Sequence, residues 1–225
     1  MRLFAAVLPP EDVAGELAAE LAGLRKLPGA DGLRWTGRPG WHLTLAFYGE
    51  VDDGLVADLS ARLARAARHT DPFPLALSGG GQFGRGRALW TGARGDLTAL
   101  RRLAERAEAA ARRAGVPMGE HRRYRPHLTL ARIRDTGGSA DTADRADTAN
   151  AADTANAADR AGTTDTTDTT EVGTRAYVEA LAGFTSRTWT VSGLALVRSN
   201  LPRSGIPGEQ PRYETVARWA LGGDG

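Results

Sequence analysis

Two copies of the sequence His-Leu-Thr-Leu hold the residues of this chain that are best suited to chemistry. They lie at residues 42–45 and 127–130 and contain two of the four histidines. In an extended strand, side chains at i and i+2 point to the same face. Each copy therefore presents an imidazole beside a hydroxyl and turns its two leucines into a core. Two such strands facing one cleft would gather two histidines and two threonines, a set that suits acid and base catalysis on a phosphate.

The roles of the two histidines follow from the pKa of imidazole. A free histidine has a pKa of about 6.5, so both protonation states are populated near neutrality. One histidine can act as a neutral base and the other as a charged acid, and each role is typically worth about 10² to 10⁴ in rate. The hydroxyls of Thr44 and Thr129 can donate hydrogen bonds to phosphoryl oxygens. This chemistry requires no metal or cofactor if the leaving group is a ribose oxygen strained in a five-membered cyclic phosphate.

Predicted strands and helices surround both copies of the motif. The patterns predict strands at 2–8, 33–36, 41–48, 73–77, 88–92, 126–133, 188–197 and 213–220. They predict helices from about residue 11 to the Pro28-Gly29 pair, after Asp52 or Asp53, after Asp96, and at 175–181. The glycine-rich residues 79–84 are expected to form a loop. The mixture indicates an α/β or α+β fold. Because similar elements flank both motifs, we expect two related lobes that face each other across a groove.

The stretch from about residue 135 to residue 170 has a different composition. It consists mainly of Ala, Asp, Thr and Asn, without an aromatic residue. It cannot bury enough apolar surface to offset the entropy lost on ordering. We therefore expect a single bilobal domain over residues 1–225, interrupted by a disordered insertion.

Composition excludes several classes of protein and site. The chain has no cysteine, which excludes disulfides, thiolate zinc sites and a cysteine nucleophile. The apolar start is too short for a signal peptide, and no stretch is long enough to cross a bilayer. We expect a cytoplasmic monomer without membrane contact. All but one of the 29 basic residues are arginines, which suit bidentate phosphate recognition, although a GC-rich coding sequence is the simpler cause of the excess.

These residues resemble the 2H phosphoesterase superfamily, which is named for two His-x-Thr/Ser-x motifs. Within it, the chain is similar to the bacterial and archaeal RNA 2′,3′-cyclic phosphodiesterases, the group first called 2′-5′ RNA ligases. The resemblance covers nearly the whole chain outside the insertion and is carried by residues 1–6, 33–35, 41–50, 89–90, 126–132, 189–191 and 213–214. The chain departs from the family pattern at Tyr48, where leucine is more usual, at Gly84, where proline is frequent, and in the insertion.

The resemblance implies an α+β bilobal fold with antiparallel-rich sheets, helices outside and the active site in the central groove. It implies hydrolysis of RNA 2′,3′-cyclic phosphate ends, or of small cyclic nucleotides, to a 2′-phosphomonoester. In this comparison His42 is the acid that protonates the departing O3′, and His127 is the base that activates water. Thr44 and Thr129 hold the phosphate, and Arg132 adds a positive contact. The residue pattern itself is nearly symmetric and does not distinguish the acid from the base.

Other functions are compatible with the same motifs. The site could perform reversible 2′-5′ RNA ligation, or the chain could be a non-catalytic nucleotide- or RNA-binding module. A metal hydrolase with His42 and His127 as ligands is disfavoured, because no carboxylate stands at typical ligand spacing. Phe47 and Tyr48 could stack on a base, although core packing is the commoner use of Phe47. His69 is expected to end a helix, and His121 lies in a basic loop that either contacts substrate or is solvated.

Overall fold

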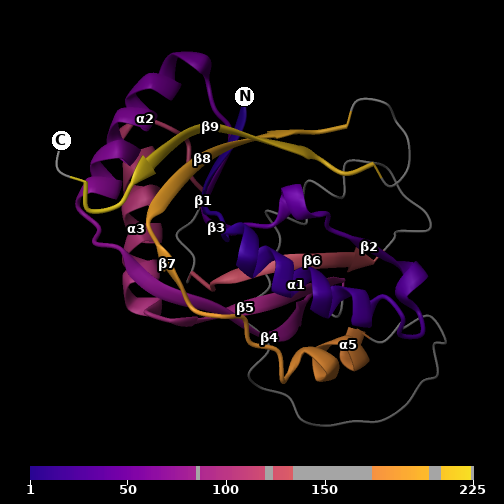
Figure 1. The fold of residues 1–225 in the computed structure, drawn as a ribbon. Helices are drawn as coiled ribbons and strands as arrows, with labels where there is room; N and C mark the ends of the chain where they lie inside the picture. Colours follow the sequence, from indigo (N-terminus) through magenta and orange to yellow (C-terminus); the bar gives the residue numbers. More distant parts are fainter. Residues whose placement is uncertain (85–86, 120–123, 134–173, 203–208, 224–225) are drawn as a thin grey trace, which may run out of the picture.

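A computed structural model describes residues 1–84, 87–119, 124–133, 174–202 and 209–223, and Figure 1 shows their arrangement. The whole predicted insertion, and His121, lie outside the described residues. The elements follow the chain in the order β1 (Arg2–Val7), α1 (Glu11–Leu24), β2 (Leu33–Trp35), β3 (Leu43–Glu50), α2 (Asp53–Arg68), β4 (Phe73–Phe83), β5 (Ala88–Gly95), α3 (Leu97–Arg113), β6 (His127–Ile133), α5 (Thr174–Leu181), β7 (Trp189–Val191), β8 (Gly193–Asn200) and β9 (Arg212–Ala220).

The strands form two sheets, and neighbouring strands within each sheet are antiparallel. The first sheet has the order β3-β1-β8-β9, and the second has the order β2-β6-β5-β4-β7. The predicted α+β class with antiparallel sheets is therefore confirmed. Each sheet contains one motif strand, β3 in the first and β6 in the second. The first sheet combines strands from both ends of the chain, so the two halves of the fold are not consecutive halves of the sequence.

The helices cover the sheets from the side on which the motif leucines lie. α2 packs against α3, α2 contacts β8 and β9, and α3 contacts β3 (Figure 1). α5 packs against β4 and β5 of the second sheet. Asp52 and Asp96 cap α2 and α3, as predicted, by accepting hydrogen bonds of 2.8 Å from the backbone N–H groups of Gly54 and Ala99. Within the described part of the chain, no helix has the length and apolar character needed to cross a membrane.

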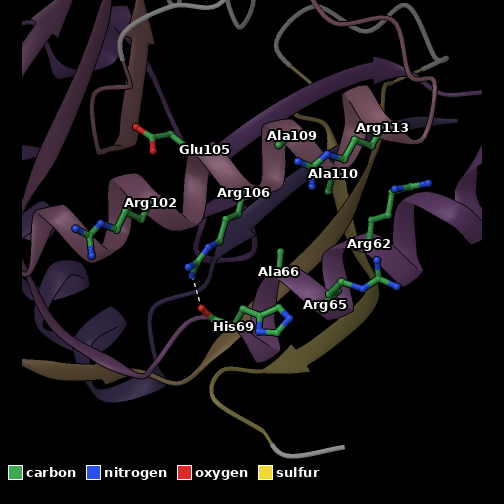
Figure 2. Close-up of a pocket in the computed structure, with 10 residues that line it drawn as sticks. All are labelled: Arg62, Arg65, Ala66, His69, Arg102, Glu105, Arg106, Ala109, Ala110 and Arg113. Atoms are coloured by element: carbon green, nitrogen blue, oxygen red, sulfur yellow. Dashed lines mark hydrogen bonds between the residues drawn. The ribbon is translucent and has the colours of Figure 1, made fainter.

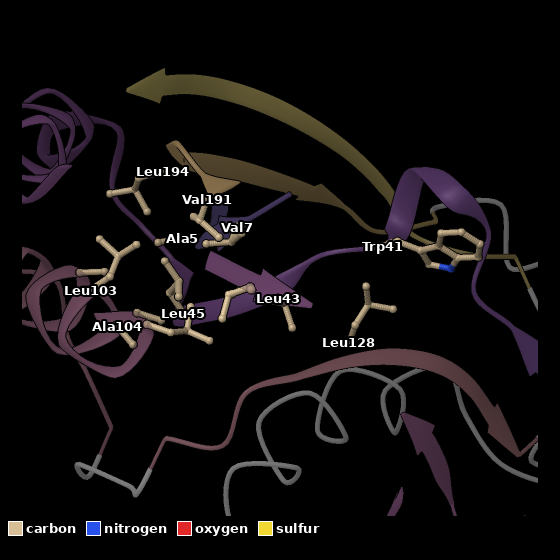
Figure 3. Packing of buried hydrophobic residues seen from close by; sticks show 14 of the residues in the cluster. Ala5, Val7, Trp41, Leu43, Leu45, Leu103, Ala104, Leu128, Val191 and Leu194 are labelled. Atoms are coloured by element: carbon tan, nitrogen blue, oxygen red, sulfur yellow. The ribbon is translucent and has the colours of Figure 1, made fainter. Parts of the chain in front are cut away.

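One continuous apolar core joins the two sheets and the helices. Leucines from α1, α2, α3 and both motif strands belong to it, and Figure 3 shows part of this packing. A second, smaller cluster consists of Phe4, Ala6, Ala195 and Val197, with Leu8, Phe47 and Tyr213 packed against it. Its members come mainly from β1 and β8, whose alternate residues belong to the main core. The first sheet therefore buries apolar side chains on both faces.

The glycine-rich segment expected to form a loop instead belongs to β4. The strand continues to Phe83, with a bulge at Gly79, where φ is +65°. A Cβ atom on Gly80 would lie 2.6 Å from Leu181, and one on Gly81 would lie 2.1 Å from the ring of Trp90. The glycines here allow close packing inside a sheet, which a reading based on turn propensity misses.

The strand predicted at 188–197 is two strands in different sheets. β7 pairs with β4 in the second sheet, and β8 pairs with β1 and β9 in the first. Only Ser192 separates them, so the chain crosses between sheets at this point. Alternation along one segment reports which residues are buried but not the sheet in which they are buried. β3 also begins two residues later than predicted, which places His42 just before the strand.

Candidate functional site

The leucines of both motifs lie in the core, as the alternation predicts. Leu43, Leu128 and Leu130 are completely buried, and Leu45 is 6% exposed. All four belong to the main core, and Figure 3 shows motif leucines from both strands in one apolar layer. The histidine and threonine of each copy are half-buried. Because β3 and β6 contact each other, the two motifs lie in neighbouring parts of the fold.

Both motif strands contain a β-bulge at the same position. In β3, Thr44 pairs with Ala6 and Ala46 pairs with Ala5, so one extra residue, Leu45, lies between them. In β6, Thr129 pairs with Trp90 and Ala131 pairs with Leu89, so the extra residue is Leu130. A bulge places two consecutive residues opposite one partner and shifts the alternation that follows. In each strand the leucine and the following alanine are accordingly both buried.

The bulge decides the face on which the next residue lies. Strict alternation would place Arg132, five residues after His127, on the opposite face from that histidine. After the bulge Arg132 pairs with Ala88, while Thr129 pairs with Trp90 two positions along β5. Arg132 therefore shares the face of His127 and Thr129.

The same shift acts on Phe47 in β3. Phe47 pairs with Phe4 and packs against the second apolar cluster, on the face of Thr44. The guanidinium of Arg2 lies 4.8 Å from the centre of the Phe47 ring. Thus, at corresponding positions of the two motif strands, β3 carries Phe47 and β6 carries Arg132.

Each motif histidine packs against two aromatic rings. The ring centre of His42 is 4.6 Å from that of Phe4 and 5.2 Å from that of Tyr213. His127 lies 4.8 Å from Phe83 and 6.3 Å from Trp90 by the same measure. These four aromatic residues were given no role from the sequence. Phe4, Trp90 and Tyr213 stand in segments that resemble the family, but no local pattern places β9 near His42 or β4 near His127.

A backbone contact fixes the hydrogen-bonding role of one nitrogen of His127. Its Nδ1 lies 2.8 Å from the carbonyl oxygen of Arg125. A carbonyl oxygen can only accept, so Nδ1 carries a hydrogen and donates it. In the neutral tautomer, this leaves Nε2 as the atom that can accept a proton.

Two other sequence expectations have clear outcomes. Tyr48 lies in the main core, and its hydroxyl donates to the carbonyl of Ala107 over 3.2 Å. Burial raises its pKa well above the usual range. Tyr48 is therefore not available to stack on a base, and that expectation is wrong. His69 ends α2 as its C-cap residue, as predicted.

Sequence comparisons agree with this geometry. Residues 7–90 match the family model of LigT-like phosphoesterases. An RNA 2′,3′-cyclic phosphodiesterase of Archaeoglobus fulgidus is 30% identical over 140 residues, which cover 60% of this chain and 73% of that protein. Proteins of the same name from Geobacillus stearothermophilus and Aeropyrum pernix are 36% and 35% identical over 44% and 42% of this chain. Those two alignments span only 32% and 53% of the relatives' own lengths.

Solved structures share the fold of the described residues. A protein of Thermus thermophilus is 27% identical, with a TM-score of 0.66 and 100% coverage of both chains. Escherichia coli LigT in its apo form is 25% identical, with a TM-score of 0.63 over 98% of this chain and 96% of that one. The sequence match, the shared fold and the paired His-Leu-Thr-Leu strands lead to one conclusion: the chain belongs to the LigT-like phosphoesterase family, within the 2H phosphoesterases.

Proposed function

We propose that the chain hydrolyses RNA 2′,3′-cyclic phosphate ends, and small 2′,3′-cyclic nucleotides, to 2′-phosphomonoesters. We further propose that it does so as a cytoplasmic monomer, without a metal or cofactor. The observation that carries the proposal is the duplicated motif strand, with its histidine and threonine on the face turned away from the leucine core in each copy. The names of the relatives, RNA 2′,3′-cyclic phosphodiesterases, support the choice of substrate.

In the proposed mechanism, His127 accepts a proton at Nε2 from a water molecule whose oxygen attacks phosphorus. The contact between His127 Nδ1 and the Arg125 carbonyl supports Nε2 as the reacting nitrogen. The base role itself comes from the family resemblance. As the new P–O bond forms, the bond from phosphorus to O3′ breaks, and His42 donates a proton to O3′. The phosphate stays on O2′. Thr44 and Thr129 donate hydrogen bonds to the non-bridging oxygens.

Arg132 adds positive charge on the same face as His127. The transition state carries negative charge on the phosphoryl oxygens, and a guanidinium can donate two parallel hydrogen bonds to them. The bulge in β6 supports this role, because it places Arg132 on the face of Thr129.

A short RNA that ends in a 2′,3′-cyclic phosphate tests the proposal. The product should be a 2′-phosphate, identified by chromatography against 2′- and 3′-phosphate standards. His42→Ala and His127→Ala should each lower kcat by about 10²- to 10⁴-fold, the range of one acid or base. Because both side chains are half-buried at the surface, the melting temperature should change little. Full activity in either variant would refute its catalytic role.

A substrate with a better leaving group distinguishes the acid from the base. A p-nitrophenyl phosphodiester releases a stable anion that needs no protonation, so only the base remains necessary. His42→Ala should therefore lose much less activity on this substrate than on the cyclic phosphate, whereas His127→Ala should lose as much as before. The opposite pattern would exchange the two roles.

The alternatives predict different products. In ligation, an RNA 5′-hydroxyl replaces water, and the same bond changes produce a 2′-5′ linkage. Adding an RNA acceptor with a 5′-hydroxyl and looking for a longer product tests this activity. A binding module would give no product from either reaction. Chelator should leave the rate unchanged, and strong inhibition by chelator would support metal-dependent hydrolysis.

A further inference from the structure

An arginine-rich cavity of about 360 Å³ lies between α2 and α3 (Figure 2). Its charged and polar lining comprises Arg62, Arg65, His69, Arg102, Glu105, Arg106 and Arg113. The two helices together contain eight arginines and four carboxylates. α3 contacts β3 of the first sheet, and the motif leucines of β3 face the main core to which the helices contribute. The cavity is therefore separate from the face that carries His42 and Thr44.

Structural contacts account for two of these arginines. Arg62 forms an ion pair of 2.8 Å with Asp58, four residues earlier on the same helix. Arg106 donates to the carbonyl of His69 and to the hydroxyl of Thr70, over 2.6 Å for the latter, and so links α3 to the end of α2. These two side chains are explained by the stability of the helix pair.

Three arginines have no such explanation. Among the described residues, no carboxylate lies within ion-pair distance of Arg65, Arg102 or Arg113. Arg65, Arg102 and Arg113 are all exposed. Glu105 is the one acidic residue in the lining, and Figure 2 shows its side chain pointing away from α2. The cavity therefore carries an excess of positive charge that a bound anion could neutralise.

The arrangement suits a chain of phosphates better than a single phosphate. Arg102, Arg106 and Arg113 lie along one side of α3. Arg102 and Arg113 are eleven positions apart, or about 16 Å at the helical rise. Arg65 reaches in from α2, and the small residues Ala66 and Ala110 lie between the two helices (Figure 2). One phosphate cannot contact both ends of this row.

We infer that this arginine row binds the sugar-phosphate backbone of single-stranded RNA, at a distance from the catalytic face. The inference rests on the proposed function, since that function makes RNA the polyanion the protein meets. Guanidinium groups pair bidentately with phosphate, and each phosphate neutralised on a single strand adds about 0.7 to the slope of log K against log salt. The site would hold long substrates by their backbone, independent of sequence.

The experiment measures binding of a fluorescent 12-nucleotide RNA with an ordinary 3′-hydroxyl by anisotropy. Excess adenosine 2′-phosphate, the expected product, occupies the catalytic site. Arg65→Ala/Arg102→Ala/Arg113→Ala should raise Kd at least tenfold and lower the salt slope by about 2, for three lost contacts. The matched control, Arg68→Ala/Arg94→Ala/Arg101→Ala, removes the same charge from exposed positions outside the cavity and should change Kd less than threefold.

Three results would overturn the inference. Equal losses in both triple variants would show that only net charge matters. A Kd for the RNA that is much higher with adenosine 2′-phosphate than without it would place the RNA at the catalytic face. Release of the RNA by ATP at the same concentration would indicate a site for small nucleotides. Hydrolysis of 2′,3′-cyclic AMP is measured separately. If the unmodified protein fails to hydrolyse 2′,3′-cyclic AMP, the proposed function is wrong. The RNA-binding inference is then still tested by the Kd values of the two triple variants.

Discussion

The two motif strands are alike for five residues and differ at the sixth. His-Leu-Thr-Leu-Ala occurs in both, with the same bulge after the threonine, and Phe47 then corresponds to Arg132. The same bulge therefore presents an apolar ring in β3 and a guanidinium in β6. The imidazole and the hydroxyl are therefore duplicated, whereas in this pair of strands a guanidinium comes from the second sheet alone.

The two histidines also differ in the groups that surround them. His42 lies against Phe4 and Tyr213, at the edge of the second apolar cluster. His127 lies against Phe83 and Trp90, and its Nδ1 is held by a backbone carbonyl. A nearly symmetric sequence thus folds into two unequal histidine environments. That inequality suits the separate acid and base roles proposed above.

After the two histidine variants, the largest expected effect comes from truncating the side chain of the sixth residue in each strand. Arg132→Ala should lower kcat/KM about 10- to 100-fold, because a hydrogen bond to a charged group contributes about 1.5–3 kcal/mol. Phe47→Ala should instead lower stability, by less than the roughly 3–5 kcal/mol typical of a fully buried phenylalanine, because Phe47 is half-buried. Steady-state kinetics on 2′,3′-cyclic AMP and thermal melting measure the two quantities.

Arg132→Lys is the control for charge without bidentate geometry and should recover only part of the activity. If Arg132→Ala lost stability and kept its activity, Arg132 would be a structural residue. The proposed contrast between a phosphate-binding Arg132 and a packing Phe47 would then be wrong.

Sequence predicted the parts of this comparison that depend on local pattern. The leucine burial and the helix caps follow from alternation and from Asp52 and Asp96. The bulges could not be predicted, because they are defined by the register with β1 and β5, which no single strand contains. The resemblance predicts a role for Arg132 beside His127, whereas alternation alone predicts that Arg132 lies on the opposite face from His127.

Long-range packing limits prediction for the same reason. The glycines of β4 predict a loop when the sequence is considered alone. In the structure, Leu181 packs against Gly80 and Trp90 packs against Gly81, so these positions lie in a strand. Likewise, the segment that contains β7 and β8 predicts a single strand, and its division between two sheets depends on partners far along the chain.

The next largest effect concerns the glycine beneath Trp90. Gly81→Ala would bring a Cβ atom to 2.1 Å from the Trp90 ring, so the ring must move. Overpacking of this kind costs about 1–3 kcal/mol. Because Trp90 contacts His127, kcat should fall as well, whereas the environment of His42 should not change. Chemical denaturation and kinetics measure the two effects.

Gly183→Ala is the matched control, because no atom lies within 4 Å of its added Cβ. A stable and fully active Gly81→Ala variant would show that Trp90 has no part in positioning His127.

A smaller effect should separate the two aromatic environments. Tyr213→Leu removes a ring beside His42, and Trp90→Leu removes one beside His127. Aromatic contacts are worth about 0.5–1.5 kcal/mol beyond burial, which corresponds to roughly a 2- to 13-fold change. In the pH profile of kcat/KM, the Tyr213 variant should shift the limb that belongs to the acid, and the Trp90 variant the limb that belongs to the base. Shifts of the same limb in both variants would contradict separate roles.

The smallest expected effect lies at an ion pair beside the second sheet. The carboxylate of Glu16 on α1 accepts from the backbone N–H and the guanidinium of Arg187, just before β7. These hydrogen bonds, the backbone one first, lower the pKa of Glu16 below its ordinary value of 4.5. The contribution to stability is therefore complete above pH 4.5 and is lost as the pH falls through the lowered pKa. Because solvent reaches both groups, Glu16→Gln should lower the melting temperature only slightly at pH 7, and the difference from the unmodified protein should vanish in acid. A difference that persists in acid would mean that packing of the Glu16 side chain, and not its charge, joins α1 to the second sheet.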